Sequence, residues 1–188
     1  MHTIHHTRAI ILKSQPSKEA DKLFWLFTEE FGLVRAVATG VRKSGAKLVS
    51  QLIDYTMVDV DLVRGRDVWR LVSATVVLDP LQGNYGAPLA RPYVRSLTAI
   101  ERFLVDEGEH GELFAHISDI SRAVSSPISP RVFDTLAIWR TLVHLGYIPG
   151  GDEVLFRSPF VETSAILTDT DIKRLIVSVN SAIKETHL

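Results

Sequence analysis

The chain has 188 residues, of which 46% are hydrophobic and 23% are charged, with a formal net charge of −1 and no cysteine. This composition predicts a folded protein of one large or two small domains. The lack of cysteine excludes disulfides, thiolate catalysis and cysteine-bound zinc or iron–sulfur sites. The sequence contains no run of about 18 or more apolar residues, so it predicts no membrane-spanning helix. The first residues lack the pattern of a secretory signal, so we expect a cytoplasmic protein.

Residues 1–80 contain five short segments with the character of β-strands, at 8–15, 21–30, 31–40, 54–63 and 68–77. In the third segment, small apolar residues alternate with Arg35, so a period of two places Arg35 outside if the apolar residues face a core. Phe24 and Trp25 are neighbours in the second segment, so one of them should lie outside the core. Five hairpin-linked strands predict an antiparallel barrel of the OB-fold type, with an SH3-like barrel as the alternative.

From residue 81 onward, a stretch rich in glycine and proline is followed by helical periodicity. The clearest helix begins after Ser129, a natural N-cap, with Pro130 at its first position. A last helix begins near Thr168, whose spacing to Asp171 is typical of a capping box. The sequence therefore predicts an α+β protein, with a barrel domain at 1–80 and a helical domain at 81–188.

One segment, ATGVRKSGAKLVSQL at 38–52, is purely cationic, and no carboxylate occurs between Glu30 and Asp54. Cations that neutralise phosphates release counterions and give an affinity that falls with salt. We therefore expect three parts of the chain to contact nucleic acid: this loop, the strand before it, and the turn between the segments 54–63 and 68–77. The alternative is a loop that is simply solvated. The expected contact residues are Arg35, Arg42, Lys43, Lys47, Arg64, Arg66 and Arg70.

The sequence contains no phosphate-binding loop, no dinucleotide-binding glycine pattern, no nucleophile elbow and no zinc-protease motif. His2, His5 and His6 are expected to belong to a ragged terminus and not to a metal site. We therefore expect a protein that is not an enzyme and binds no metal or other cofactor. An acid–base site assembled from distant residues is the alternative that the sequence leaves open.

The helical half has arginines near apolar helix faces. An apolar pocket with a cationic rim suits an acidic peptide that ends in an aromatic residue. The expected partner-binding residues are Arg91, Arg95, Arg131 and Arg140. The alternative for each of them is a solvated group on a helix surface.

The order of several motifs resembles the bacterial recombination mediator family RecO. The segment AIIL is followed by KEADKLFWLFTEEFGLVRAVATGVRKSGAKL, and a second marker, LGYIP, lies at 145–149. The residues that match the family's E-x-D, TE..G and A-x-G pattern are Glu19, Asp21, Thr28, Glu29, Gly32, Ala38 and Gly40.

The resemblance implies an OB-fold followed by a helical domain, in a non-catalytic protein of DNA repair and recombination after DNA damage. Such a protein would bind single-stranded and double-stranded DNA and anneal complementary strands. With the partner RecR it would help load RecA onto DNA coated with single-stranded-DNA-binding protein, whose acidic C-terminal tail family members contact. It would be cytoplasmic, and associated with the nucleoid when bound to DNA. A protein adaptor that recognises an acidic tail peptide without significant DNA affinity is the alternative, and the oligomeric state stays open.

Two features depart from the family pattern. Many members have a four-cysteine zinc module after the LGY-x-P stretch, but residues 150–165 of this chain contain no cysteine. We expect this region to be stabilised by packing or by paired strands, with Val154, Phe156 and Phe160 as its apolar residues. The chain also looks short for the family at its C-terminus.

Overall fold

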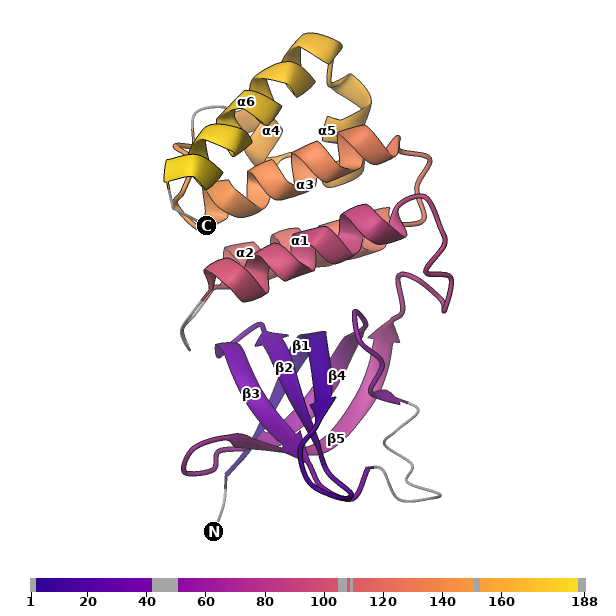
Figure 1. Cartoon of the computed structure of the whole chain (residues 1–188), viewed down its shortest axis with the longest axis vertical. Helices are drawn as coiled ribbons and strands as arrows, with labels where there is room; N and C mark the ends of the chain where they lie inside the picture. The colour runs from indigo at the N-terminus through magenta and orange to yellow at the C-terminus, as the bar shows by residue number, and fades with distance from the viewer. Residues whose placement is uncertain (1–2, 42–50, 105–107, 109, 151–152, 186–188) are drawn as a thin grey trace. The chain divides into compact units, whose positions relative to one another are not determined.

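The computed structural model describes residues 3–41, 51–104, 108, 110–150 and 153–185. In these residues, five β-strands are followed by six α-helices, so the expected α+β class is confirmed (Figure 1). The contacts divide the chain into two units, Met1–Gln82 with Val105–Phe114, and Gly83–Leu104 with Ala115–Leu188. The first boundary between the units follows Gln82, and the sequence predicts one after residue 80. The sequence does not predict that residues 105–114 belong with the barrel. No helix of the described residues is long and apolar enough to cross a membrane.

The strands of the first unit form a closed barrel in the order β1-β2-β3-β5-β4, as expected for an OB-fold. Their bounds are β1 Ile4–Pro16, β2 Lys22–Thr28, β3 Gly32–Ala38, β4 Met57–Val63 and β5 Trp69–Leu78. Four of the five strand pairs are antiparallel. The pair that joins β3 to β5 is parallel, at Ala36 opposite Trp69 and Val37 opposite Arg70. A hairpin pattern alone does not predict this parallel pair.

The first strand, β1, pairs with both β4 and β2 and so completes the barrel. A β-bulge between Ile11 and Lys13 interrupts its register with β2, and bulges bend a strand and increase its twist. The strand begins at Ile4, so His5 and His6 belong to the barrel, and the expectation of a ragged terminus is wrong for them. The barrel core is apolar and includes Ala9, Ile11, Phe24, Leu26, Val34, Ala36, Val58, Val60, Leu62, Trp69 and Leu71.

Four of the residues that match the family pattern fix turns of the barrel. The hydroxyl of Thr28 donates to the carbonyl of Gly32 at 2.9 Å and accepts from the N–H of Phe31 at 3.0 Å. The carboxylate of Asp21 accepts from the N–H of Gly40 at 2.9 Å. Gly32 and Gly40 have φ angles of +62° and +69°, a region that glycine enters without steric cost. These positions therefore matter for the path of the backbone.

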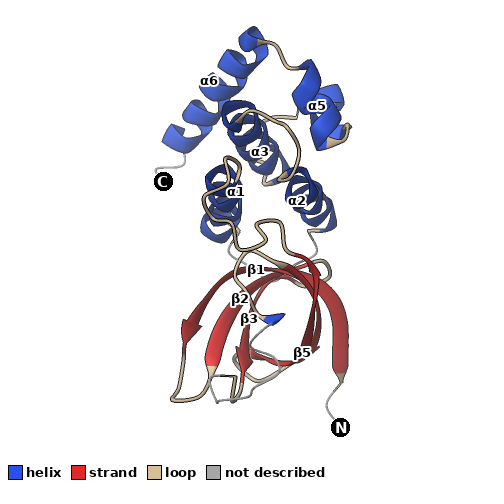
Figure 2. Ribbon diagram, turned by 90° about the vertical axis from the view of Figure 1, so that its right-hand side faces the viewer, coloured by secondary structure: helices blue, strands red, loops and turns tan. Residues whose placement is uncertain are grey.

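The helices of the second unit surround α3 (Pro130–His144), which is buried along most of its length and packs against α1, α5 and α6 (Figure 2). As predicted, Ser129 caps α3 by accepting from the N–H of Val132 at 3.3 Å, and Pro130 opens the helix. The other helices are α1 (Ala90–Phe103), α2 (Gly111–Ala123), α4 (Glu153–Arg157), α5 (Phe160–Ile166) and α6 (Asp169–Glu185).

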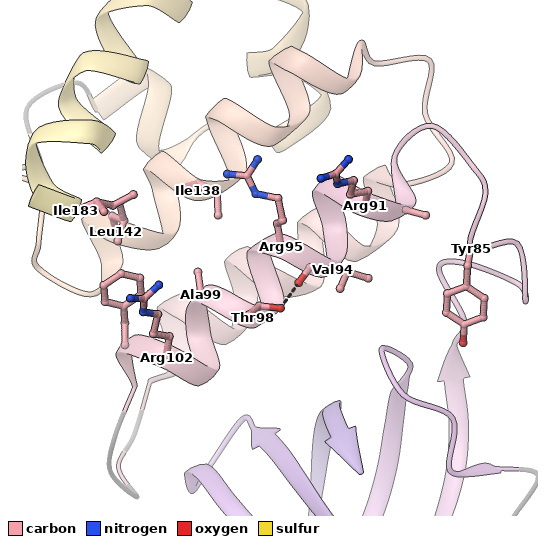
Figure 3. A pocket seen from close by; sticks show the side chains of 12 residues that line it. Tyr85, Arg91, Val94, Arg95, Thr98, Ala99, Arg102, Ile138, Leu142 and Ile183 are labelled. Carbon is pink, nitrogen blue, oxygen red and sulfur yellow. Dashed lines mark hydrogen bonds between the residues drawn. The ribbon is translucent and has the colours of Figure 1, made fainter. Parts of the chain in front are cut away.

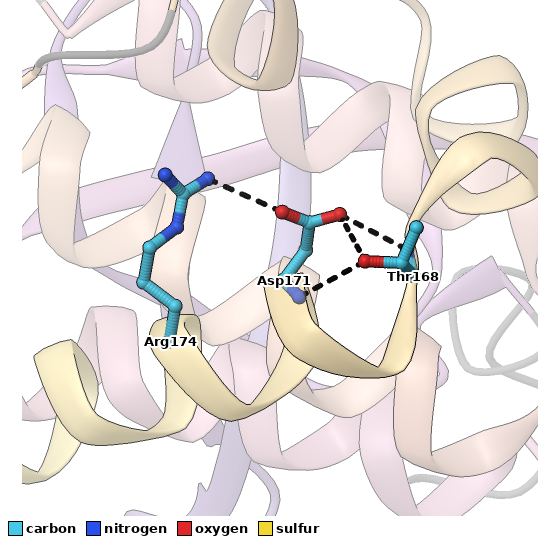
Figure 4. Close-up of polar contacts among 3 residues, drawn as sticks. All are labelled: Thr168, Asp171 and Arg174. Atoms are coloured by element: carbon cyan, nitrogen blue, oxygen red, sulfur yellow. Dashed lines mark hydrogen bonds and ion pairs between the residues drawn. The ribbon is translucent and has the colours of Figure 1, made fainter.

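The last helix, α6, begins with the predicted capping box (Figure 4). The hydroxyl of Thr168 accepts from the N–H of Asp171 at 3.2 Å, and the Asp171 carboxylate accepts from the N–H and the hydroxyl of Thr168 at 3.1 and 2.6 Å. Arg174 adds an ion pair at 3.5 Å. The hydrogen bonds from Thr168 lower the pKa of Asp171, so this carboxylate is ionised at neutral pH, as the positive end of a helix dipole favours.

We expect the substitution Gly32→Ala to destabilise the barrel unit. A Cβ at this position would overlap the carbonyl oxygen of Gly108 and lie 2.9 Å from its nitrogen, and the positive φ is already unfavourable for alanine. Gly83 is the matched control, because its φ is +72° but nothing lies within 4 Å of an added Cβ. In chemical denaturation, Gly83→Ala should lower the free energy of unfolding by about 1–2 kcal/mol, and Gly32→Ala by more. Equal losses would contradict a steric role for Gly108.

Candidate functional site

A row of three side chains crosses the outer surface of β1, β2 and β3. Lys13 lies directly opposite Trp25, and Trp25 lies directly opposite Arg35. Because neighbouring strands are about 5 Å apart, the three Cα atoms span about 10 Å. Phe24 is fully buried, so Trp25 is the outward member of the Phe24–Trp25 pair. The Lys13 ammonium lies 4.3 Å from the centre of the Trp25 ring, a cation–π distance. We call Lys13, Trp25 and Arg35 the Trp25 row.

Arg70 extends this cationic surface onto β5. It lies opposite Val37, two residues along β3 from Arg35, and its side chain is exposed. Arg35 is exposed as well, as the alternation of the strand predicted. Neither arginine has a hydrogen bond or ion pair with any residue that the structure describes. The parallel β3–β5 pair thus brings together two of the expected nucleic-acid contacts.

The other expected contacts fall into two groups. Arg64 and Arg66 are exposed in the turn between β4 and β5. The guanidinium carbon of Arg64 lies 5.3 Å from the ring centre of Trp69, so Arg64 covers part of that ring. The remaining residues, Arg42, Lys43 and Lys47, lie outside the described residues.

The surface formed by β1 and β4 has a different electrostatic character. Arg8 and His6 stand directly opposite Asp59 and Asp61 across the two strands. The Arg8 guanidinium contacts the Asp59 carboxylate at 3.1 Å, and His6 contacts Asp61. Hydrogen bonds from Ser73 and His6 lower the pKa of Asp61, although burial opposes this, so its negative charge is kept. The barrel therefore has one cationic surface and one surface on which Asp59 and Asp61 have partners across the strands.

The helical unit contains a groove of about 410 Å³ between α1, α3 and α6 (Figure 3). Its apolar lining includes Val94, Ala99, Phe103, Ile138, Leu142 and Ile183. Three arginines of α1 line it as well: Arg91, Arg95 and Arg102. Spacings of four and seven residues put them on one side of the helix. Sequence reasoning missed Arg102, although its two-turn spacing from Arg95 was a usable signal.

A smaller hollow of about 240 Å³ adjoins this groove and shares Arg95 and Ile138 with it. Arg131 and Asp134 line the smaller hollow. The Arg95 guanidinium donates to one carboxylate oxygen of Asp134 at 2.8 Å. Burial raises the pKa of Asp134, and the positive charges of Arg95 and Arg91 partly oppose that rise. Three of the four expected partner-binding arginines, Arg91, Arg95 and Arg131, therefore line the two hollows.

The fourth, Arg140, does not line either hollow, and the expectation that it binds a partner is corrected. Arg140 is only 2% exposed. Its guanidinium donates to the carbonyls of Leu155 and Ser158 at 2.7 and 2.8 Å, and to the hydroxyl of Thr163 at 2.6 Å. Burial lowers the pKa of Arg140 to about 10, with the charge of Asp119 opposing the change, so the group stays protonated at neutral pH. Arg140 is thus a structural residue.

Through these bonds, Arg140 joins α3 to α4 and α5, which lie in the cysteine-free region that follows LGYIP. Asp119 adds a bond from α2, since its carboxylate accepts from the N–H of Phe160 at 2.7 Å. Phe160 is fully buried, and the Phe156 ring lies 4.5 Å from that of His144. The region is stabilised by packing and hydrogen bonds between helices. Within the described residues, no three His, Asp or Glu side chains could together hold a metal ion.

Comparison with known proteins places the barrel in a defined family. Residues 1–78 match the family model described as "Recombination protein O N terminal". Among similar proteins, "DNA repair protein RecO" of Clostridium kluyveri is 31% identical over 116 residues, which are 61% of this chain and 45% of the relative. The protein of the same name from Nocardioides is 29% identical over 152 residues, 78% of this chain and 61% of the relative.

The barrel of this chain belongs to the family of RecO N-terminal domains. A further RecO relative, from Clostridium perfringens, is 42% identical over 62 residues, 33% of this chain and 25% of the relative. Against the first of these RecO proteins, the matched part of the chain spans about half of the relative's length.

We expect Arg140→Met to destabilise the helical unit by about 2–5 kcal/mol, because methionine fills similar space but leaves two carbonyls and a hydroxyl without their donor. Thermal and chemical denaturation would measure the change. Arg122→Met, at an exposed position of α2, is the control and should change the free energy of unfolding by no more than about 0.5 kcal/mol. Similar values for the two variants would contradict the structural role of Arg140.

Proposed function

We propose that this protein acts in DNA repair and recombination as a RecO-type mediator, and that its barrel binds DNA through the Trp25 row. The observation that supports the proposal is the position of the row on β1, β2 and β3 of an OB-fold barrel. The surface of strands 2 and 3 is where OB-folds bind oligonucleotides. The names of the relatives agree with a repair role.

The chemistry of the row suits a single strand of nucleic acid. Arg35 and Arg70 are exposed cations that can neutralise phosphates, while the indole of Trp25 offers a flat surface for a base of any identity. Lys13 lies over one face of that indole. A base that stacks there must displace the ammonium, which then becomes available to a phosphate. Duplex DNA, whose bases are already stacked, would use the cations alone and bind less tightly.

Contact with two strands through their backbones and bases would allow the protein to anneal complementary strands. Cooperation with RecR and loading of RecA onto coated single-stranded DNA are proposed on the family resemblance. So are a cytoplasmic location and association with the nucleoid on DNA. The loop cations Arg42, Lys43 and Lys47, together with Arg64 and Arg66, are proposed to extend the phosphate-contacting surface.

We expect Trp25→Ala to weaken binding of a labelled single-stranded oligonucleotide by about 1–3 kcal/mol, with little effect on a duplex. Arg35→Ala should weaken both and should reduce the dependence of log K on log salt by about one phosphate. Fluorescence anisotropy across a salt series would measure these effects. Arg8→Ala is the matched control, because it removes the same charge from the β1–β4 surface. Equal losses for Arg35→Ala and Arg8→Ala would reject this location of the DNA site.

A second function is proposed for the groove of the helical unit, which fits an acidic peptide that ends in an aromatic residue. The apolar lining can take the aromatic side chain, and the arginines of α1 can pair with carboxylates. The tail of single-stranded-DNA-binding protein has this chemistry. A protein that bound such a tail without measurable DNA affinity would be an adaptor, and the oligonucleotide titration separates the two cases.

We expect the double substitution Arg91→Glu with Arg102→Glu to weaken the binding of an acidic synthetic peptide that ends in phenylalanine. The affinity should fall at least tenfold, because two attractive charges are replaced with repulsive ones. Isothermal titration calorimetry at moderate salt would give the affinity. Arg122→Glu with Arg157→Glu makes the same change of charge outside the residues that line the groove. If both double variants weakened binding equally, overall charge and not the groove would explain the affinity.

A further inference from the structure

Arg95 occupies a special place among the arginines of the groove, because it alone of them lines both the main groove and the smaller hollow. Figure 3 shows its side chain extending from α1 toward α3. Its guanidinium is already engaged by the carboxylate of Asp134, at 2.8 Å. The side chain of Arg95 is 61% exposed and that of Asp134 is 27% exposed, so the ion pair lies at the surface of the hollow.

The Asp134 carboxylate is incompletely satisfied in this arrangement. Its second oxygen, Oδ1, is out of reach of solvent and has no hydrogen-bond partner among the described residues. Burial raises the pKa of this carboxyl group. The charged groups around it are Arg95 and Arg91 on α1 and Arg131 on its own helix. The residues that α6 contributes to the hollow, Ile176, Val179 and Asn180, do not ionise.

We infer that Asp134 is a built-in competitor for the carboxylate ligand of the groove: it occupies Arg95 in the free protein, and an acidic peptide must take its place. This inference rests on the proposed peptide-binding function of the groove. An acidic peptide is the occupant that fits, because Asp134 is itself a carboxylate on a short side chain. The apolar lining of the adjoining groove favours a peptide over a nucleic-acid backbone.

The exchange has an electrostatic consequence. When a ligand carboxylate takes over Arg95, Asp134 loses its attractive partner while one of its oxygens remains buried. A buried carboxylate without a counter-charge binds a proton more readily. The complex therefore binds more protons than the free protein, and linkage requires that affinity for the peptide rises as pH falls. Competition by Asp134 thus makes peptide binding sensitive to pH.

The test compares Asp134→Asn with the unmodified protein in calorimetric titration of the acidic peptide ending in phenylalanine. We expect Asp134→Asn to bind about two- to fivefold more tightly at neutral pH, as the loss of a partly exposed ion pair implies. As pH falls from neutral, the affinity of the unmodified protein should rise, and that of Asp134→Asn should stay constant while the pH remains above the range near pH 4 in which the peptide's own carboxylates titrate.

Two controls make the outcomes distinct. A peptide in which every acidic side chain is replaced by its amide and the C-terminus is amidated should show no gain with Asp134→Asn. Chemical denaturation of the variant should show that it remains folded. If the unmodified protein binds the acidic peptide and Asp134→Asn binds it equally or more weakly, Asp134 does not compete and the inference falls while the groove's function stands. If neither protein binds the peptide at any pH, the proposed function of the groove falls as well.

Discussion

The β-bulge in β1 is the constraint on which both the barrel and its cationic surface depend. If Leu12 paired regularly with β2 instead of forming the bulge, the alternation of the strand would turn Lys13 toward the core, on the same side as Ile11. The bulge places it opposite Trp25 on the outside. It also bends the strand, which pairs with β4 along its first half and with β2 along its second. One inserted residue thus helps to close the sheet and completes the Trp25 row.

Local rules were enough for much of the fold. The period of two located the five strands, and the caps at Ser129 and Thr168 marked two helix starts, because these signals act between residues close in sequence. The bulge gave no such signal. Ile10, Ile11 and Leu12 are all buried, so the residues before Lys13 do not alternate between apolar and polar, and the register of the strand is hidden. The parallel β3–β5 pair depends on strands far apart in the chain.

The candidate sites show the same division. The outward positions of Arg35 and of one aromatic residue in β2 followed from alternation alone. The burial of Arg140 could not be predicted from its position in the helix, because its hydrogen-bond partners come from later in the chain. They are Leu155, Ser158 and Thr163. A sequence cannot distinguish an arginine that meets solvent from one that meets backbone carbonyls of a distant segment. For that reason one expected partner-binding residue, Arg140, is structural, whereas the seven-residue spacing of Arg102 from Arg95 was a local signal that places it at the groove.

The paired charges on β1 and β4 affect how the barrel behaves before it touches any ligand. Arg8 pairs with Asp59 on that side, whereas Arg35 and Arg70 have no ion pair among the described residues. The described surface of the barrel is therefore more positive at Arg35 and Arg70 than at the Arg8–Asp59 pair. For the DNA binding proposed above, long-range attraction would favour an approach in which this cationic surface faces the polyanion. In the proposed complex, the charge arrangement would act on the rate of encounter with DNA as well as on the lifetime of the complex.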